Sequence, residues 1–190
     1  MSKEYFEGKQ FKGINYTESP LKKGEYENCS FSFCIFANSD LTKIIFSECT
    51  FDQCDLSMAK ISGTVFKEIQ FKNCKLLGLH FDECNSFLIS FGFENCLLNF
   101  SSFFKLKIKS TLFKDCKLQE VDFVETNLSK SKFINCDLSR AIFENSILEQ
   151  ADFRTSYNFS INPEINKLNK AKFTTQNIAG LLNKYNIIIE

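Results

Sequence analysis

Large apolar side chains recur at every fifth position along most of this chain. From Phe6 to Phe81, each fifth residue is Phe, Tyr, Leu or Ile, and the same spacing resumes at Leu88 and continues to Phe153. An α-helix repeats about every 3.6 residues and a strand every second residue, so neither would place these side chains on one face. The pattern therefore predicts a winding of the backbone whose own unit is five residues long.

A small residue, usually Cys, Ser, Thr or Ala, stands two places before most of these apolar residues. One large and one small side chain in each unit are thus expected to point inward, and the other three outward. Such self-similarity at a short period predicts a solenoid, in which each unit buries its apolar side chains only against its neighbours.

A longer period of twenty residues is visible in the cysteines. Cys34, Cys54 and Cys74 form one series, and Cys96, Cys116 and Cys136 continue it after a slip of two residues. Four units therefore make one turn, and about seven and a half turns stacked about 4.8 Å apart predict a rod about 35 Å long. Leucine-rich repeats, the main alternative, also run at roughly twenty residues but do not repeat every five. The predicted fold class is an all-β solenoid.

Two extra residues interrupt the register near residues 82–87. Because two residues are too few for a substantial loop, we expect a bulge between two stacked halves there. The repeat is expected to span residues 1–157, and residues 158–190 are expected to form a separate C-terminal tail.

The tail is expected to close the open end of the solenoid, which would otherwise expose apolar core and unpaired backbone. After a turn at Asn162-Pro163, the pattern predicts a short helix capped by Thr174 or Thr175, followed by a β-branched strand. The tail holds more apolar residues than a cap requires, so it is also predicted to form a homodimer interface. The residues assigned to this interface are Ile178, Leu181, Leu182, Tyr185, Ile187 and Ile189.

Lys and Arg together number 23, as do Asp and Glu, so the chain carries no formal net charge. This balance argues against direct binding to nucleic acid or to an anionic membrane. No run approaches the roughly 18 apolar residues of a membrane-spanning helix, and the opening MSKEYFEGKQ differs from a secretory signal. A cytoplasmic protein is therefore expected.

The candidate reactive residues do not form a catalytic or metal-binding pattern. All nine cysteines fall in the small inward position, which predicts buried, apolar thiols rather than disulfides or a zinc site. The only histidine, His80, is expected to face outward without an orienting partner. No nucleophile elbow, phosphate-binding glycine loop or metal motif occurs. We therefore expect no enzymatic activity, no cofactor and no metal.

Two surfaces are candidates for binding a partner. Residues twenty apart share a side, which places six glutamates together in the N-terminal half: Glu4, Glu7, Glu25, Glu27, Glu48 and Glu68. They form either an acidic stripe that binds a partner or part of an ordinary charge-mixed surface. Around the slip, several apolar residues occupy positions expected to face outward: Phe87, Ile89, Leu97, Phe100 and Phe104. An apolar patch there indicates protein contact, unless the large Phe91 in a small position distorts this side locally.

The units CDLSM, CKLLG, CDLSR, TNLSK and ADFRT fit the pattern Ala-Asp/Asn-Leu-x-x, and residues 4–155 resemble the pentapeptide-repeat family. The resemblance implies a right-handed quadrilateral β-helix. The segment INPEIN, residues 161–166, and the closing Ile run look like the C-terminal ends of the microcin-immunity and quinolone-resistance (Qnr) subgroup. Members of that subgroup dimerise through this tail and protect DNA gyrase from topoisomerase poisons by resembling duplex DNA in size and charge.

The resemblance implies that this chain binds DNA gyrase or topoisomerase IV and protects it from a toxin or a quinolone. The acidic stripe would then lie where DNA phosphates otherwise lie. Because only two residues are inserted, the loop-poor immunity type is the nearer match. The alternative is a structural scaffold protein that binds another protein through the apolar residues between Phe87 and Phe104.

Overall fold

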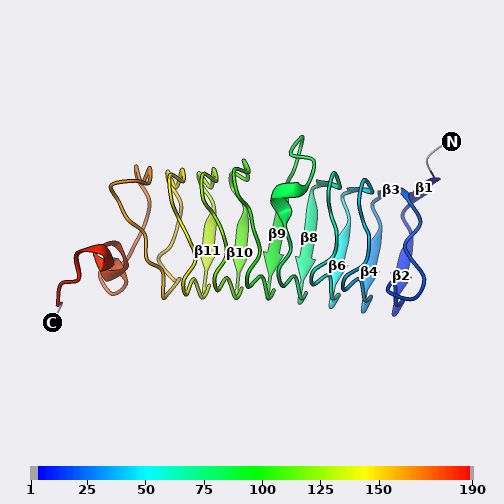
Figure 1. Ribbon diagram of the computed structural model, residues 1–190, viewed down its shortest axis with the longest axis horizontal. Coiled ribbons are helices and arrows are strands. Elements are labelled where there is room, and N and C mark those ends of the chain that lie inside the picture. Colours follow the sequence, from blue (N-terminus) through cyan, green and yellow to red (C-terminus); the bar gives the residue numbers. More distant parts are fainter. Residues whose placement is uncertain (1–3, 189–190) are drawn as a thin grey trace.

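Parallel pairing between residues twenty apart winds the chain into a long rod of stacked coils (Figure 1). The computed structural model describes residues 4–188. Within these residues the fold is an all-β parallel solenoid of about seven turns. The first and last coils lie at opposite ends of the rod (Figure 1).

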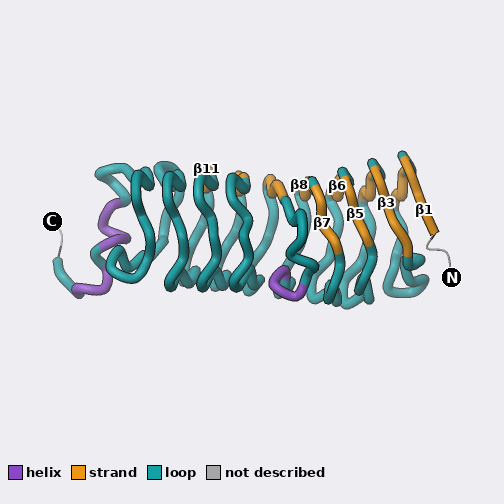
Figure 2. The backbone as a smooth tube through the Cα atoms, turned by 90° about the horizontal axis from the view of Figure 1, so that it is seen from above, coloured by secondary structure: helices purple, strands orange, loops and turns teal. Residues whose placement is uncertain are grey.

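The strands form two parallel sheets that run along the rod (Figure 2). The four-stranded sheet, in the order β1-β3-β5-β7, comprises β1 (Glu4–Glu7), β3 (Gly24–Glu27), β5 (Ile45–Ser47) and β7 (Val65–Lys67). The seven-stranded sheet, in the order β11-β10-β9-β8-β6-β4-β2, comprises β2 (Gln10–Lys12), β4 (Ser30–Ser32), β6 (Thr50–Asp52), β8 (Ile69–Lys72), β9 (Phe91–Glu94), β10 (Leu112–Lys114) and β11 (Lys132–Ile134). The described residues also contain three short 3-10 helices, η1 (Phe81–Glu83), η2 (Ile178–Leu181) and η3 (Asn183–Tyr185).

Isolated β-bridges extend this pairing, so that four parallel rows of residues run along the rod. Row 1 is the four-stranded sheet, continued by the bridged series Lys107, Asn127, Ile147 and Lys167. Row 2 is the seven-stranded sheet, continued by Asp152 and Lys172. Row 3 is the series of bridges from Asn15 to Tyr157, and row 4 includes the series from His80 to Ile142. Each row presents outward side chains at the coil spacing of about 4.8 Å.

Stacked aromatic rings form much of the core. In row 2 the inward residue is Phe in nine successive coils, and neighbouring ring centroids lie 4.7–5.4 Å apart with planes within 22°. The column consists of Phe11, Phe31, Phe51, Phe71, Phe93, Phe113, Phe133, Phe153 and Phe173. Parallel pairing imposes this stacking because it places equivalent positions one strand spacing apart.

Side chains in the small inward position tie each coil to the one before it. The hydroxyls of Thr64, Thr126 and Ser146 donate to the carbonyl oxygen of the residue 23 positions earlier, at 2.7–2.8 Å. Several thiols make the same contact at 3.3–3.5 Å, as Cys54 does with the carbonyl of Phe31. All nine cysteines are buried, as their position predicts. Because these polar groups find a partner inside the coil, Cys, Ser and Thr can share one position.

Asp residues beside the inward residue close the turn that follows. Oδ1 of Asp55, Asp122 and Asp152 accepts a hydrogen bond from the backbone N–H two residues later, at 2.8–3.2 Å. Asp and Asn side chains make this local bond readily, which is why they recur at this position of the unit.

Residues with positive φ mark most of the corners between rows. They stand two places after the inward residue, as in Asn28 (φ 50°), Met58 (φ 57°) and Lys130 (φ 63°). The left-handed conformation costs about 1 kcal/mol for a residue with a Cβ, and it disfavours β-branched side chains most. None of the non-glycine residues with positive φ between 4 and 188 is Val, Ile or Thr.

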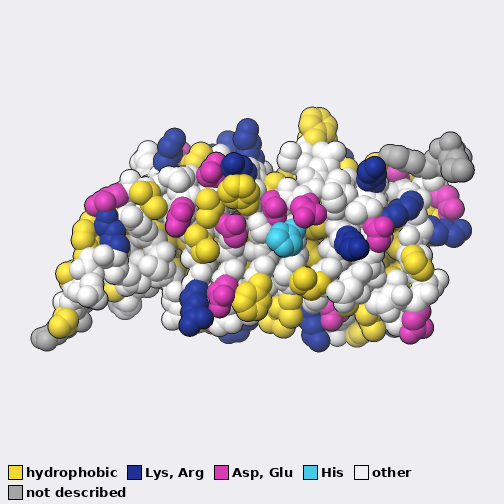
Figure 3. Space-filling model, viewed as in Figure 1, with side chains coloured by type: hydrophobic (Ala, Val, Ile, Leu, Met, Phe, Trp, Pro, Cys, Tyr) yellow, Lys and Arg dark blue, Asp and Glu magenta, His cyan; other side chains and the backbone are white. Residues whose placement is uncertain are grey.

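The slip near residues 82–87 is a projecting loop, so the prediction of a bulge was wrong. Its two ends are held by hydrogen bonds from the N–H of Asn85 to the Thr64 carbonyl and from the N–H of Ser90 to the Phe66 carbonyl. Residues 85–90 stand out from the middle of row 1 (Figures 1 and 3). The side chain of Phe87 in this loop is 74% exposed.

Two inward assignments next to this loop were also wrong. Leu88, which the five-residue frame places inside, lies outside with φ at 60°, whereas Ile89, expected outside, is only 8% exposed. Phe91 is buried in the small position, with its ring centroid 5.0 Å from that of Phe81. Because Ile89 and Phe91 fill the interior, the extra residues are accommodated outside the coil.

The coil continues beyond the predicted boundary at residue 157. Backbone N–H groups of Lys167 and Lys172 donate to the carbonyls of Ser146 and Ala151, and the ring of Phe173 stacks 5.4 Å from that of Phe153. The prediction missed this last coil because Asn166 occupies its small position. Like the hydroxyls described above, the Asn166 amide donates to a carbonyl 23 positions earlier, at 2.7 Å.

The segment after Phe173 folds as η2 and η3, in place of the single helix expected there. The side chain of Asn177 accepts from the N–H of Thr174 and donates to the Phe153 carbonyl, both at 2.8 Å. Gly180 lies against Phe159, where a Cβ would overlap the ring. These contacts hold the segment flat on the last coil. Ile187 and Ile188 lie in no strand, and Ile189 lies outside the described residues.

Candidate functional site

Row 1 carries the six predicted glutamates of the acidic stripe over its first four coils. Glu4 and Glu7 lie on β1, Glu25 and Glu27 on β3, and Glu48 and Glu68 at the corner that follows β5 and β7. Glu7 and Glu27 are partners in the parallel register, and Glu48 and Glu68 line one shallow hollow. The period of twenty therefore placed these residues on one side of the rod.

The acidic stripe is not uniformly acidic. Lys67 continues the line of Glu27 on β7, and Lys22 Nζ lies 3.4 Å from Glu4 Oε2. The hydroxyl of Tyr5 donates to Glu27 Oε2 at 2.5 Å, and this hydrogen bond raises the pKa of Tyr5 to about 12. The carboxylates remain at the surface, where they can meet a cationic partner.

The structure does not gather the five predicted apolar residues into one patch. Phe87 stands on the projecting loop of row 1, Leu97 belongs to row 3, and Phe104 follows the row 4 residue Ser102. The ring of Phe104 is partly covered by Lys105, whose Nζ lies 4.6 Å from the ring centroid. Since Ile89 is buried, the predicted patch is wrong as a continuous surface.

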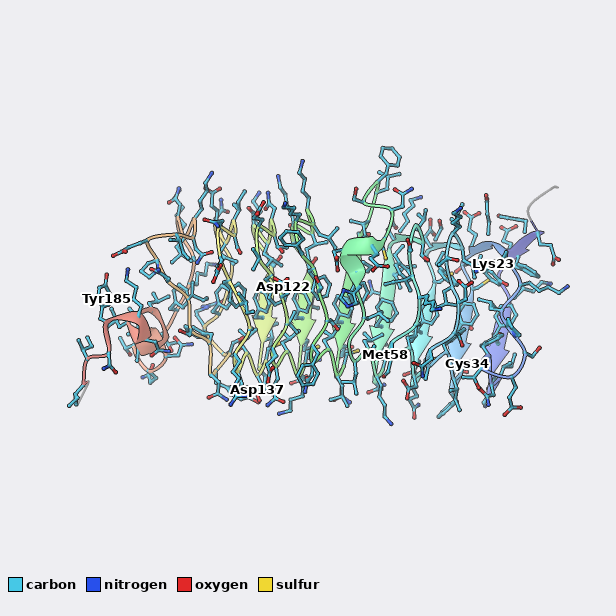
Figure 4. The ribbon with its side chains drawn as sticks, in the orientation of Figure 1. Lys23, Cys34, Met58, Asp122, Asp137 and Tyr185 are labelled. Atoms are coloured by element: carbon cyan, nitrogen blue, oxygen red, sulfur yellow. The ribbon has the colours of Figure 1, made fainter. Side chains whose placement is uncertain are left out.

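A smaller apolar patch lies at the corner between rows 3 and 4, where Met58 and Phe100 are 58% and 59% exposed. The thioether of Met58, which is labelled in Figure 4, lies over Gly78 of the neighbouring coil. Sequence reasoning missed Met58. Gly78 could have indicated this patch in the sequence, because a glycine at a corner leaves room for the side chain at the same corner of the neighbouring coil.

The C-terminal end exposes several apolar side chains of the predicted dimer interface. Ile178, Tyr185 and Ile187 are each about half exposed. Leu181 and Leu182 are half-buried, and Leu181 packs against the core. Ile188 is almost fully exposed and was not predicted. Tyr185 is oriented by a 2.9 Å hydrogen bond from its hydroxyl to Glu164 Oε1.

The described residues offer few groups for catalysis. His80 is exposed, with Nδ1 3.5 Å from Asp82 Oδ1. Burial raises the pKa of the Cys49 thiol to about 12, which keeps it protonated and unreactive. Between residues 4 and 188, no group of three or more His, Cys, Asp or Glu side chains could hold a metal ion. Over the same range, no helix is long and apolar enough to cross a membrane.

Sequence reasoning also missed Asp137, a buried carboxylate on row 3 (Figure 4). It accepts hydrogen bonds from the Ser139 hydroxyl at 2.6 Å, the Asn158 amide at 3.0 Å and the Gln119 amide at 3.3 Å. Burial raises the pKa of Asp137, but the hydrogen bonds from Ser139 and Asn158 and the charge of Lys117 outweigh burial and hold this pKa below its usual value. Asp137 therefore joins three coils and has little capacity left for a ligand.

Comparison with known proteins agrees with this architecture. The family model for the pentapeptide repeat region matches residues 86–158, and that for pentapeptide repeats in eight copies matches residues 29–67, together more than half of the chain. No curated protein sequence matches the chain.

Three solved structures of QnrB1, a plasmid-mediated fluoroquinolone resistance protein, are similar in fold. One trypsin-treated form is 15% identical, with a TM-score of 0.76 over 98% of this chain and 92% of that chain. A second is 18% identical, with a TM-score of 0.63 over 98% and 97%. The full-length form is 18% identical, with a TM-score of 0.51 over 97% and 100%. The five-residue coil, and the family models that match it on both sides of the projecting loop, show that this chain belongs to the pentapeptide-repeat family.

Proposed function

We propose that this chain binds DNA gyrase or topoisomerase IV and protects the enzyme from a toxin or a quinolone. The observation that carries the proposal is the acidic stripe, six carboxylates on one side of a rigid rod. The fold shared with a fluoroquinolone resistance protein supports the choice of target.

Electrostatic competition is the proposed mechanism. A protein that holds DNA neutralises its phosphates with Lys and Arg, so the groove that receives the duplex is basic. The acidic stripe offers that groove carboxylates from successive coils, about 4.8 Å apart. The parallel ladders fix these positions before binding, so little conformational freedom is lost, and charge complementarity directs the encounter.

This role requires binding and no chemical step. We therefore propose that the chain acts without catalysis or cofactor, in the cytoplasm, where a topoisomerase meets DNA. The right-handed quadrilateral form of the coil, which the family resemblance implies, is part of the same proposal.

The direct test is a gyrase supercoiling and DNA-cleavage assay with a quinolone or a microcin-type toxin present. Purified protein should restore supercoiling and reduce poison-induced cleavage at roughly micromolar concentrations, the range expected of a standard-sized protein interface. If neither activity changes, protection is excluded. The corner of Met58 and Phe100 would then be the surface to test for scaffold binding, since both side chains are exposed.

We also propose that the chain forms a homodimer through its C-terminal end. Replacing Ile178 and Ile187 by Asp should then produce monomers, because two half-exposed side chains would bring like charges into the contact. Leu181 is left unchanged so that the covering of the last coil stays intact. Sedimentation equilibrium distinguishes the two states.

A matched control replaces Ile35 and Ile142 by Asp, since both are 44% exposed and lie on rows 3 and 4. This variant should remain dimeric. A native chain that sediments as a monomer at micromolar concentration would contradict the dimer.

A further inference from the structure

The C-terminal half of row 1, the corner that follows it and the adjoining edge of row 2 carry seven exposed lysines, named here the lysine field. They are Lys107, Lys109, Lys130, Lys132, Lys167, Lys170 and Lys172. Dark blue side chains stand along the upper edge of the rod on the C-terminal side of the projecting loop (Figure 3). The same row is therefore acidic before the loop and basic after it.

Parallel register holds these lysines close together. Lys107 and Lys167 belong to the series of β-bridges that continues row 1. On row 2, the backbones of Lys132 and Lys172 pair with the backbone of Asp152 through β-bridges on either side of it. Lys130 occupies a corner with positive φ. The field extends over four coils, which at about 4.8 Å per coil places the amino groups within a length of about 15 Å.

The lysine field lacks the close ion pairs that some basic residues make elsewhere on the rod. Lys105, for example, pairs with Glu125 of a neighbouring coil at 3.7 Å, and Lys114 pairs with Glu94 at 2.6 Å. No ion pair within 4.0 Å among residues 4–188 includes a lysine of the field. Two carboxylates lie among these lysines: Asp152, which is bound by Arg154 with Nη2 2.8 Å from Oδ2, and Glu149, which lies on row 1 in the coil after Lys130.

A shallow hollow with further hydrogen-bond donors adjoins the lysine field on row 2. Its lining residues include Lys132, Arg154, Thr155, Lys172 and Thr174, together with Asp152. Ammonium groups with hydroxyls at their side are suited to bind phosphate oxygens, whereas the Arg154 guanidinium is held by Asp152.

A second copy of the chain fits this surface poorly. An antiparallel copy would set the acidic stripe of one chain opposite the lysine field of the other, so charge alone does not exclude it. The projecting loop, with Phe87 exposed, would however stand between the two faces and hold them apart. A partner that carries many negative charges in a row fits better.

We propose that the lysine field binds the phosphate backbone of a nucleic acid. The duplex crosses the rod on the C-terminal side of the projecting loop, because the acidic stripe repels it on the other side. Contacts from lysine to phosphate position the duplex and carry no base sequence, so binding is independent of sequence. This proposal revises the expectation from the net charge, because a sum of zero conceals two separated fields of opposite sign.

The test is fluorescence anisotropy of a short labelled DNA duplex at about 25 mM salt and above, with the full chain. Replacing Lys107, Lys109, Lys130 and Lys132 by Gln should lower the affinity at least tenfold. It should also reduce the slope of log K against log salt by up to about 3.6, which is about 0.9 for each of the four phosphates that the variant no longer neutralises. Gln already occupies the same corner at position 150, so the fold should tolerate the change.

A matched control replaces Lys43, Lys60, Lys72 and Lys75 by Gln, which removes the same charge from the N-terminal half. Its affinity should stay within about twofold of the native value. Equal losses in both variants would overturn the proposal, because net charge alone would then account for binding. A native chain that leaves the duplex unbound at about 25 mM salt would also overturn it, and self-association that disappears in the lysine-field variant would assign the surface to a second copy.

Discussion

Replacing Phe113 by Ala should lower the free energy of unfolding by about 4 kcal/mol. The Phe113 ring is fully buried and stacks between Phe93 and Phe133, with centroids 5.1 Å and 4.9 Å away. It also meets the rings of Phe103 and Phe123 edge-on, both at 6.0 Å. Alanine would leave a cavity in the middle of the column, and β-strands paired on both sides leave little room for collapse around it.

Urea unfolding followed by circular dichroism measures this loss, and Phe113→Leu is the control. Leucine is the inward residue of row 3 in coils such as those of Leu98 and Leu118, so it should fit and cost less than about 1.5 kcal/mol. An Ala variant within about 1 kcal/mol of the native chain would show that the column is not the stabilising core.

Reversing Glu25, Glu27, Glu48 and Glu68 to Lys should abolish topoisomerase protection. The change replaces four negative charges by four positive ones on the surface proposed to meet a basic groove, so attraction becomes repulsion. The four positions lie on the outside of the coil, and thermal unfolding should show a folded rod. The measurement is relief of quinolone- or toxin-induced cleavage as the variant is titrated.

A matched control reverses four acidic residues of other rows: Glu18, Asp115, Glu120 and Glu144. The net charge changes by the same amount, yet this variant should protect as the native chain does. If the stripe variant still protects the topoisomerase, the acidic stripe is excluded as the binding surface, but the topoisomerase is not excluded as the target. Loss in both variants would mean that overall charge, and no particular surface, governs binding.

The five-residue frame predicted the coil well because each unit depends only on local residues and on the equivalent unit one turn away. Phe113 and Cys116, for example, are inward as the frame requires. The frame did not predict the loop at residues 85–90. Which of Leu88, Ile89 and Phe91 points inward depends on packing against several coils, and a local pattern does not contain that information. The last coil was missed since Asn166 is larger than the residues expected in its position.

The same reasoning explains what was predicted of the binding surfaces. A period of twenty residues was enough to place the glutamates of the acidic stripe on one side. It could also have revealed the lysine field, but charges summed over the whole chain concealed it.

The short helix after Phe173 was predicted from the spacing of Ile178, Leu181, Leu182 and Tyr185. The contacts of Asn177 and Gly180 with the coil beneath them, which the spacing does not contain, favour 3-10 turns.

Selection at the corner codons should exclude only a few amino acids. Codons for Asn and Lys stand one base change from those for Thr and Ile, and such changes would strain a turn that requires positive φ. Exchanges among Asn, Lys, Glu, Gln and Arg leave the backbone untouched while they reverse or erase a surface charge. Proteins built on this coil can therefore exchange one charged partner for another by substitutions at the corner positions, while the fold is retained.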